Sequence, residues 1–415
     1  MNDSDSLNLA HLHAVRVIAE TGSVSGAAIV LFRAQSAVTR AVQETESALG
    51  ERLFDRKSSG MLPTAVCRAV LHRSARVFDE LQEVARWSRA RRSPRQTGAD
   101  GALPAYLLNT RRLQLFVTLA RHKHMPSAAR ALGITQPAIS SAIKILESGA
   151  GMPLFHRNPR GLLLTSEGET FLLHVRRALN ELRHVSDDVA ALRGSIQGSV
   201  TVGALPLGRT LILPDAIARV IARFPGVRVV TDESNYESLV GGLRAGDVDF
   251  ILGALRSNDV ASGLENEKLM SEELVVLARH GHPLAAEHDL TVSQLAHAQW
   301  IMPRRQSPAR GLFESMFKRT KTKPPQPTVE SADLAVIRGL LLRTDMLAVL
   351  SAQQLHYECQ SGQLVVLDAP TRNTNRDIGL TLRAGSTPSP AARALIDAIR
   401  RVVGDVARTT RVIRR

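Results

Sequence analysis

The sequence predicts a helical N-terminal half that contains a duplicated helix-turn-helix unit, followed by a C-terminal α/β half. Three observations support this fold class. The chain of 415 residues matches itself when it is shifted by 101 positions. A regular apolar seam follows the second copy of the repeat, over residues 168–194. From Gly198 onward, helical spacing of the apolar residues gives way to an alternation of strands and helices.

The repeat aligns without a gap. The shift places Leu12 on Leu113, Ala27 on Ala128, Gln35 on Gln136, Glu46 on Glu147, Phe54 on Phe155, Arg56 on Arg157 and Gly60 on Gly161. So many matches in one register indicate a duplication. We assign a drifted first copy with its helix to residues 8–89 and the second copy to residues 109–167. The segment between them, 90–108, is basic and rich in small residues, which is typical of a flexible linker.

In the second copy, the spacing of apolar residues predicts three short helices. Gly133 permits the positive φ that a tight turn between the second and third helices needs. We expect Thr135 to cap the third helix, and Pro137 lies in the first turn, where a missing N–H has little cost. The inner face of this helix is expected to hold Ala138, Ile139, Ala142, Ile143 and Leu146.

The outer face of the third helix is short and polar, which suits insertion into the major groove of DNA. The segment that follows, LFHRNPRGLLLT, predicts two strands around a basic tip, a wing suited to phosphate contact. The predicted DNA-binding residues are Thr135, Gln136, Pro137, Ser140, Ser141, Lys144, Arg157 and Arg160. The alternative is an amphipathic helical hairpin that binds no DNA.

Charge and composition narrow the function classes. The net charge is +14, and residues 101–195 hold 12 Lys and Arg against 6 Asp and Glu. This excess favours nucleic acid as a partner. Two cysteines, no evident signal peptide and no apolar run long enough to span a bilayer predict a cytoplasmic protein. Dinucleotide and Walker motifs, a nucleophile elbow and a third ligand near the paired histidines are all missing, so we expect no enzyme, cofactor or metal site.

The first copy differs from the second at the turn before the third helix and on the outer face of that helix, where base recognition requires a defined backbone geometry. Phe32 replaces Gly133 at the turn, where a bulky residue strains a positive φ. Ala34 replaces Thr135 and removes the cap. The outer face becomes Gln35, Thr39 and Gln43, with Arg40 beside it. We expect this copy to retain the fold for dimer contacts or weak phosphate binding; the alternative is a second reader of a half-site.

A long helix is predicted over residues 166–193. Its apolar residues recur at steps of four and three: Phe171, Val175, Ala178, Leu182, Val185, Val189 and Leu192. This heptad seam predicts a two-helix coiled coil, so we assign residues 168–194 to a linker and dimerisation helix. The first copy keeps the same phase, with Val70, Val77, Leu81 and Val84, although Ser74 and Ser88 interrupt it. The alternative is a helix that packs on its own domain.

The C-terminal half, residues 196–408, alternates strands and helices, which predicts a parallel, doubly wound sheet. A second α/β unit follows, and the chain then returns to the first through RDIGLTLR and a helix over residues 389–403. We therefore predict two lobes: lobe I from residues 196–270 and 372–405, and lobe II from residues 271–371.

The second copy resembles the winged helix-turn-helix of LysR-type transcriptional regulators. The shared series is Leu113, Phe116, Ala128, Ala129, Leu132, Gln136, Pro137, Ala138, Ser140, Leu146, Glu147, Leu154, Phe155, Arg157, Leu164, Thr165, Glu167 and Gly168. Ser141 departs from the basic residue that the family often has, and Gly149-Ala150-Gly151 departs from its usual end of the reading helix. GALPLGRTLILP, DFILGALR and RHGHPLA resemble the subgroup of galactose-binding-protein and protocatechuate regulators.

The resemblance implies a two-lobed effector domain, similar to periplasmic binding proteins. In such sheets, ligands bind where the carboxyl ends of strands face helix N-termini. The predicted ligand-binding residues are Leu207, Arg209, Thr210, Asn235, Arg304, Gln306 and Ser331. The arginines are suited to a carboxylate, and the amides and hydroxyls to a sugar or a carboxylate. Alternatively, each arginine is a solvated surface charge and Ser331 caps its helix.

The expected function is that of a ligand-responsive transcriptional regulator, a homodimer or homotetramer that binds double-stranded operator DNA and contacts RNA polymerase. Binding of a sugar or carboxylate effector would shift the population of DNA-binding geometries. No membrane partner is expected. Two alternatives remain open: an architectural DNA-binding protein whose effector domain does not sense, or an α/β solute-binding protein or enzyme.

Overall fold

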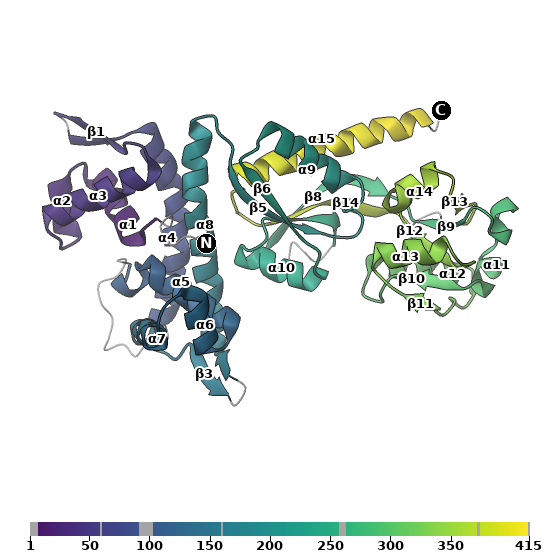
Figure 1. Cartoon of the computed structure of the whole chain (residues 1–415), viewed down its shortest axis with the longest axis horizontal. Helices are drawn as coiled ribbons and strands as arrows, with labels where there is room; N and C mark the ends of the chain where they lie inside the picture. Colours follow the sequence, from purple (N-terminus) through teal and green to yellow (C-terminus); the bar gives the residue numbers. More distant parts are fainter. Residues whose placement is uncertain are drawn as a thin grey trace. The chain divides into compact units, whose positions relative to one another are not determined.

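The computed structural model describes residues 7–58, 60–90, 103–158, 161–256, 263–371 and 374–413 (Figure 1). The chain divides into two compact units. The first unit is Met1–Gly198 with Arg244–Asp247, and the second is Ser199–Leu243 with Val248–Arg415. Within the described residues, no helix is both long and apolar enough to span a lipid bilayer.

The first copy of the repeat folds as three helices and a hairpin, followed by a long helix. Its elements are α1 (Leu9–Thr21), α2 (Val24–Val30), α3 (Gln35–Leu49), β1 (Phe54–Lys57), β2 (Gly60–Pro63) and α4 (Ala65–Ala90). Gly22 and Gly50 end α1 and α3 in the left-handed conformation, with φ of 71° and 65°. The predicted trihelical unit is therefore present in this copy.

The second copy repeats the same order. After the short 3-10 helix η2 (Ala105–Leu107) come α5 (Thr110–His122), α6 (Met125–Leu132), α7 (Gln136–Ala150), β3 (Phe155–Asn158), β4 (Gly161–Leu164) and α8 (Ser166–Leu192). Thr165 begins α8 by accepting a hydrogen bond from the Gly168 amide at 2.9 Å. Thr64 has the same role at the start of α4, where it accepts from the Cys67 amide at 3.1 Å.

The seam of α8 packs along α4 of the first copy, so it is covered within one chain, which agrees with the alternative of a helix packed on its own unit. Arg73 pairs with Asp188, and Glu80 pairs with His174, so the two helices run antiparallel. The seam residues of both helices are fully or almost fully buried: Val70, Val77, Leu81, Val84, Phe171, Val175, Ala178, Leu182, Val185 and Val189. The seam that was expected to join two chains is thus covered by the same chain. Leu192 departs from the prediction, since it is 55% exposed at the last turn of α8.

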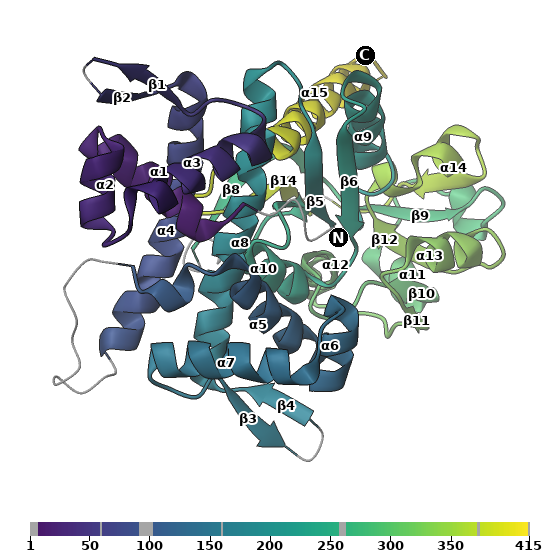
Figure 2. The same cartoon turned by 60° about the vertical axis from the view of Figure 1, so that its left-hand side comes forward.

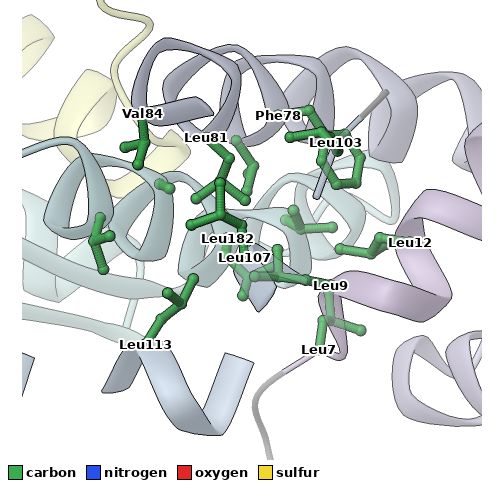
Figure 3. Packing of buried hydrophobic residues seen from close by; sticks show 14 of the residues in the cluster. Leu7, Leu9, Leu12, Phe78, Leu81, Val84, Leu103, Leu107, Leu113 and Leu182 are labelled. Carbon is green, nitrogen blue, oxygen red and sulfur yellow. The ribbon is translucent and has the colours of Figure 1, made fainter. Parts of the chain in front are cut away.

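A single apolar core joins the two copies. It contains residues from α1 and α4 of the first copy and from α5, α7 and α8 of the second. Figure 3 shows Leu12 and Phe78 from the first copy packed in the same cluster as Leu113 and Leu182 from the second. Leu103 and Leu107, from the segment that precedes α5, also enter this core. The two repeats therefore fold as one unit.

Lobe I of the second unit is a five-stranded sheet with helices. Its elements are β5 (Gly198–Ala204), α9 (Ile212–Arg223), β6 (Val227–Asp232), α10 (Tyr236–Ala245), β7 (Phe250–Ala254), β8 (Leu264–Glu272), β14 (Arg376–Arg383) and α15 (Pro390–Ile413). The strand order is β6-β5-β7-β14-β8. β14 spans the predicted return segment RDIGLTLR from its first to its last residue.

Lobe II is a second five-stranded sheet, ordered β11-β10-β12-β9-β13. Its elements are β9 (Val275–Arg279), η4 (Pro283–Ala286), α11 (Val292–His297), β10 (Trp300–Met302), α12 (Pro308–Arg319), β11 (Val329–Glu330), α13 (Leu334–Leu341), β12 (Leu347–Leu350), η5 (Ala352–Leu355), α14 (His356–Gln360) and β13 (Leu364–Leu367).

Both sheets are mixed: the parallel pairing predicted from the alternation of strands and helices is present, and antiparallel strands, which were not predicted, join it. β5 pairs with β7, and β10 pairs with β11 and β12, in parallel. β14 is antiparallel to β7 and β8, and β9 is antiparallel to β12 and β13. The physical reason in lobe I is that β14 re-enters the sheet from lobe II and therefore runs opposite to the strands formed before the crossing.

Candidate functional site

The exposed face of α7 carries the predicted reading residues. Thr135, Gln136, Pro137, Ser140, Ser141 and Lys144 are all exposed. Ile139, Ala142, Ile143 and Leu146 are buried as predicted. Ala138 was expected to face inward but is exposed. All four residues from Thr135 to Ala138 are exposed, so the first turn of α7 protrudes from the domain, as a helix that enters a groove must.

The turn before α7 has the predicted backbone geometry. Gly133 has φ of 63°, and Thr135 holds the N-cap position in an extended conformation. The Thr135 side chain, however, makes no capping hydrogen bond. The expected cap contact is therefore wrong, and the hydroxyl stays on the exposed face.

The wing is fixed to α7 and to the end of α5. The Glu147 carboxylate accepts hydrogen bonds from the amides of Leu154 and Phe155, at 2.8 and 3.3 Å. The Leu162 amide donates to the Lys123 carbonyl at 2.8 Å. These contacts set the position of the β3–β4 hairpin beside α7. Arg157 lies in β3, and Arg160 lies outside the described residues.

The first copy keeps the turn geometry that was expected to fail. Phe32 has φ of 51° and is 96% exposed. The Arg33 amide donates to the Ala28 carbonyl at 3.0 Å, as the Ile134 amide donates to the Ala129 carbonyl at 3.1 Å. The left-handed turn thus persists without glycine, because the packed helices on both sides impose it. Ala34 makes no cap, as expected.

The predicted effector residues lie at the carboxyl ends of strands. Leu207, Arg209 and Thr210 follow β5, Asn235 precedes α10, Arg304 and Gln306 follow β10, and Ser331 follows β11. Leu207 is buried, Arg209, Thr210 and Ser331 are half-buried, and Asn235, Arg304 and Gln306 are exposed.

Arg209 is held by main-chain acceptors. Its Nε donates to the Ala204 carbonyl at 2.7 Å, and its Nη2 donates to the Glu233 carbonyl at 3.0 Å. Burial lowers the pKa of Arg209, against the opposing effect of the Glu233, Asp333 and Asp232 carboxylates. Asp333 belongs to lobe II, so the strand ends of the two lobes are close enough to interact electrostatically.

The Thr210 hydroxyl is the one predicted ligand contact that is buried without a hydrogen-bond partner in the described part of the chain. An unpaired buried hydroxyl is costly, and a ligand oxygen would satisfy it. Asn235 accepts from the Ser238 amide at 2.9 Å, and Ser331 accepts from the Asp333 amide at 3.1 Å. The helix cap beside Ser331 is Asp333, not Ser331 itself.

Sequence reasoning missed a polar cluster where the chain crosses between the lobes. Glu272 at the end of β8 lies opposite Arg376 at the start of β14, 3.5 Å apart, and hydrogen-bonds with Ser351. Burial raises the pKa of Glu272 to about 7, against the opposing effect of Arg376. Ser351 is 79 positions from Glu272 in the chain. The only sequence signal for this contact was the prediction that the chain crosses twice between the lobes. No group of His, Cys, Asp or Glu suited to a metal ion occurs among the described residues.

Known families match most of the chain. Residues 193–404 match the family described as LysR substrate binding domain. Residues 9–68 and, separately, residues 110–169 match the family described as bacterial regulatory helix-turn-helix protein, lysR family. Both copies of the repeat therefore carry the helix-turn-helix signature.

Similar proteins are regulators. The HTH-type transcriptional regulator GalR of Pseudomonas putida is 49% identical over 98% of this chain and 100% of that protein. The HTH-type transcriptional regulator PcaQ of Agrobacterium fabrum is 32% identical over 71% of this chain and 95% of that protein.

Two solved structures share the fold. A full-length OxyR variant from Pseudomonas aeruginosa has a TM-score of 0.55 at 23% identity, over 71% of this chain and 94% of that chain. CbnR, a LysR family transcriptional regulator, has a TM-score of 0.51 at 20% identity, over 71% of this chain and 99% of that chain.

Proposed function

The chain belongs to the LysR family and is a ligand-responsive, DNA-binding transcriptional regulator; we propose that it reads its operator with α7 and the adjoining wing. Gln136, Ser140 and Lys144 contact base edges, since amide, hydroxyl and ammonium groups suit the acceptors of the major groove. Thr135, Pro137 and Ser141 flank them, and Arg157 and Arg160 contact phosphates. The observation that carries this proposal is the protruding, exposed first turn of α7.

The test of base reading uses operator DNA selected from a random library by the full-length protein. Lys144→Ala and Gln136→Ala are each expected to weaken binding to this DNA, by about 1–3 kcal/mol for a lost base contact. Arg183→Ala, an exposed change on α8, is the matched control. Fluorescence anisotropy gives the affinities. Operator binding by both α7 variants at the affinity of the control would show that α7 is not the reader.

We also propose that the effector is a small carboxylate or sugar held between the strand ends of the two lobes. Leu207 and Thr210 belong to the lobe I side, with Arg209 and Asn235; Arg304, Gln306 and Ser331 belong to the lobe II side. Thr210 supports this site, because its buried hydroxyl lacks an acceptor or donor in the described part of the protein. Thermal shift with a panel of sugars and aromatic acids tests it, since a ligand of the folded state raises the melting temperature. No shift with any member would count against this effector class.

We propose that each domain has a separate role. Residues 109–167 read DNA, residues 168–194 link, and residues 196–408 sense the effector, through lobe I (196–270 and 372–405) and lobe II (271–371). We propose that the protein acts in the cytoplasm as a homodimer or homotetramer that contacts RNA polymerase and catalyses no reaction. The relatives named above, which are regulators, support these assignments.

A further inference from the structure

The contact between α4 and α8 has an internal two-fold relationship. Arg73 pairs with Glu181 at 2.8 Å, and His174 pairs with Glu80 at 2.6 Å. Arg73 and His174 are equivalent positions of the two copies, 101 residues apart, and so are Glu80 and Glu181. Each copy therefore contributes the same two positions, with the partners exchanged. This exchange is the mark of an isologous interface, in which one surface pairs with its own copy.

Two further contacts obey the same symmetry. Arg76 lies 3.3 Å from Glu181, and its equivalent Arg177 lies 3.7 Å from Glu80. Near the axis itself, equivalent positions meet each other. The Leu9 amide donates to the Thr110 hydroxyl at 3.0 Å, and these two residues are separated by 101 positions. One chain thus contains a pseudo-dimer of the helix-turn-helix unit.

The pseudo-two-fold places the two third helices at opposite ends of the α4–α8 pair. Figures 1 and 2 both show α3 and its hairpin at one end, and α7 and its hairpin at the other. Two-fold related reading helices match the two half-sites of duplex DNA, because a half-site pair has its own two-fold axis. This arrangement normally requires a pair of subunits, and here a single chain supplies it.

The first copy keeps the contacts that orient a reading helix and its wing. The Leu53 amide donates to Glu46 at 2.7 Å, as the Leu154 amide donates to Glu147 at 2.8 Å. The Met61 amide donates to the Gly22 carbonyl at 2.9 Å, which matches the wing contact of the second copy. Together with the left-handed turn at Phe32, these bonds hold α3 and β1 by the same contacts that hold α7 and β3.

The surface of α3 is suited to DNA but differs in chemistry from that of α7. Gln35, Arg40 and Gln43 are exposed. A groove of about 600 Å³ lies beside α3 and β1, and its polar and charged lining residues are Thr39, Gln43, Glu46, Arg52, Asp55, Arg56 and Lys57. Arg40 pairs with Glu44 on the same helix at 2.6 Å. An exposed pair of this kind contributes little free energy, so the guanidinium is available for exchange onto DNA.

We propose that the first copy is a second sequence reader, and that one chain recognises two unlike half-sites of an asymmetric operator. This inference rests on the proposed function of α7. Thr39, Arg40 and Gln43 replace Ser140, Ser141 and Lys144, and different side chains prefer different bases. The first copy therefore recognises a sequence of its own, rather than repeating the half-site of the second copy.

The test uses the full chain and the selected operator, together with two DNAs in which one or the other half-site is scrambled. The variants are Gln43→Ala and Arg40→Ala in α3, Lys144→Ala in α7, and Arg86→Ala on α4 as the control. Each α3 variant is expected to lose roughly 5- to 100-fold in affinity for the intact operator. On DNA whose first-copy half-site is scrambled, the same variants are expected to bind like the wild type.

The outcomes separate the two proposals. If the α3 variants lose affinity equally on intact and scrambled DNA, with a salt slope flatter by about one unit for Arg40→Ala, the first copy only contacts phosphates and this inference is wrong. If they lose no affinity at all, the first copy does not contact DNA and the inference is equally wrong. If Lys144→Ala is also without effect on the intact operator, the proposed function of α7 fails as well. Thermal melting of each variant shows whether it is folded like the control.

Discussion

Arg73 donates a hydrogen bond from Nη1 to the Glu181 carboxylate at 2.8 Å, across the boundary between two copies of one repeat. The two side chains are 2% and 4% exposed, so the ion pair is buried in the interior of the first unit. Arg73 also donates from Nε to Asp188 at 2.6 Å. A buried charge that loses its partner of opposite charge is strongly destabilising. Substitution of either Arg73 or Glu181 is therefore expected to lower stability.

The first prediction concerns this pair. Arg73→Leu removes the guanidinium that pairs with both Glu181 and Asp188, so we expect the free energy of unfolding to fall by about 3 kcal/mol. Arg86→Leu breaks an exposed pair with Glu83 on the same helix and is expected to cost less than about 0.5 kcal/mol. Urea unfolding measures both. Equal effects of the two changes would contradict a structural role for the buried pair.

The second prediction concerns the seam. Leu182→Asp and Val185→Asp each place a carboxylate at a buried position of the apolar contact between α8 and α4, where removing the charge from water is costly. Because this contact lies within one chain, we expect the first unit to lose its fold and its DNA binding together. Limited proteolysis and circular dichroism follow the fold, and sedimentation follows the mass. A variant that remains fully folded but changes from dimer to monomer would show instead that the seam joins two chains.

The third prediction concerns the effector. Thr210→Val replaces the unpaired hydroxyl with a methyl group of similar size, and Arg304→Ala removes a cation on the opposite lobe. Both variants are expected to lose the response to ligand and to keep DNA binding without ligand. The measurement is operator binding with and without the compound that shifts the melting temperature. A full response in both variants would place the ligand site elsewhere.

The fourth prediction concerns pH. The pKa of Glu272 is raised to about 7 by burial, from an ordinary value of 4.5. Between these values the folded protein retains a proton that the unfolded chain releases, so the contribution of this group to stability falls as the pH rises from about 4.5 to 7. We expect the wild type to lose stability relative to Glu272→Gln over this range. Parallel stability curves for the two proteins between about pH 5 and 8 would rule out this titration.

The fifth prediction uses the equivalent turn positions of the two copies. Phe32→Gly removes a side chain from the left-handed region, and the ring is 96% exposed, so little packing is lost. We expect a gain of about 1 kcal/mol. Gly133→Ala is the reverse change; no atom lies within 4 Å of the added Cβ, so any loss reflects φ alone. A loss of stability in Phe32→Gly would mean that the aromatic ring packs against a surface.

Much of the first unit could be predicted because its signals are local. The exposed face of α7 and the burial of Ile139, Ala142 and Leu146 follow from helical spacing. In the second unit, the boundaries of β14 follow from alternation in the same way. The pattern on α8 gave the correct apolar stripe but not the helix that covers it. A heptad seam has the same appearance whether its partner is a second chain or an earlier segment of the same chain.

The contacts that the sequence did not predict join distant segments. Ser351 and Glu272 are 79 positions apart, and their meeting depends on how lobe II returns to lobe I. Ala138 is exposed because the first turn of α7 extends beyond the neighbouring helices. The spacing of apolar residues along a helix does not show where its neighbours end. The turn at Phe32 persists because tertiary packing overrides the local preference of a bulky residue.

The pseudo-dimer has a consequence for how this regulator evolves. In a regulator whose pair of reading helices comes from two identical subunits, one codon change alters both helices at once, so the operator must change symmetrically. Here α3 and α7 are encoded at separate positions of one gene. A mutation can change the base preference of one helix without changing the other. Each half-site of the operator can therefore diverge independently. The duplication therefore allows the two half-sites that one chain binds to differ from each other, even where identical chains assemble.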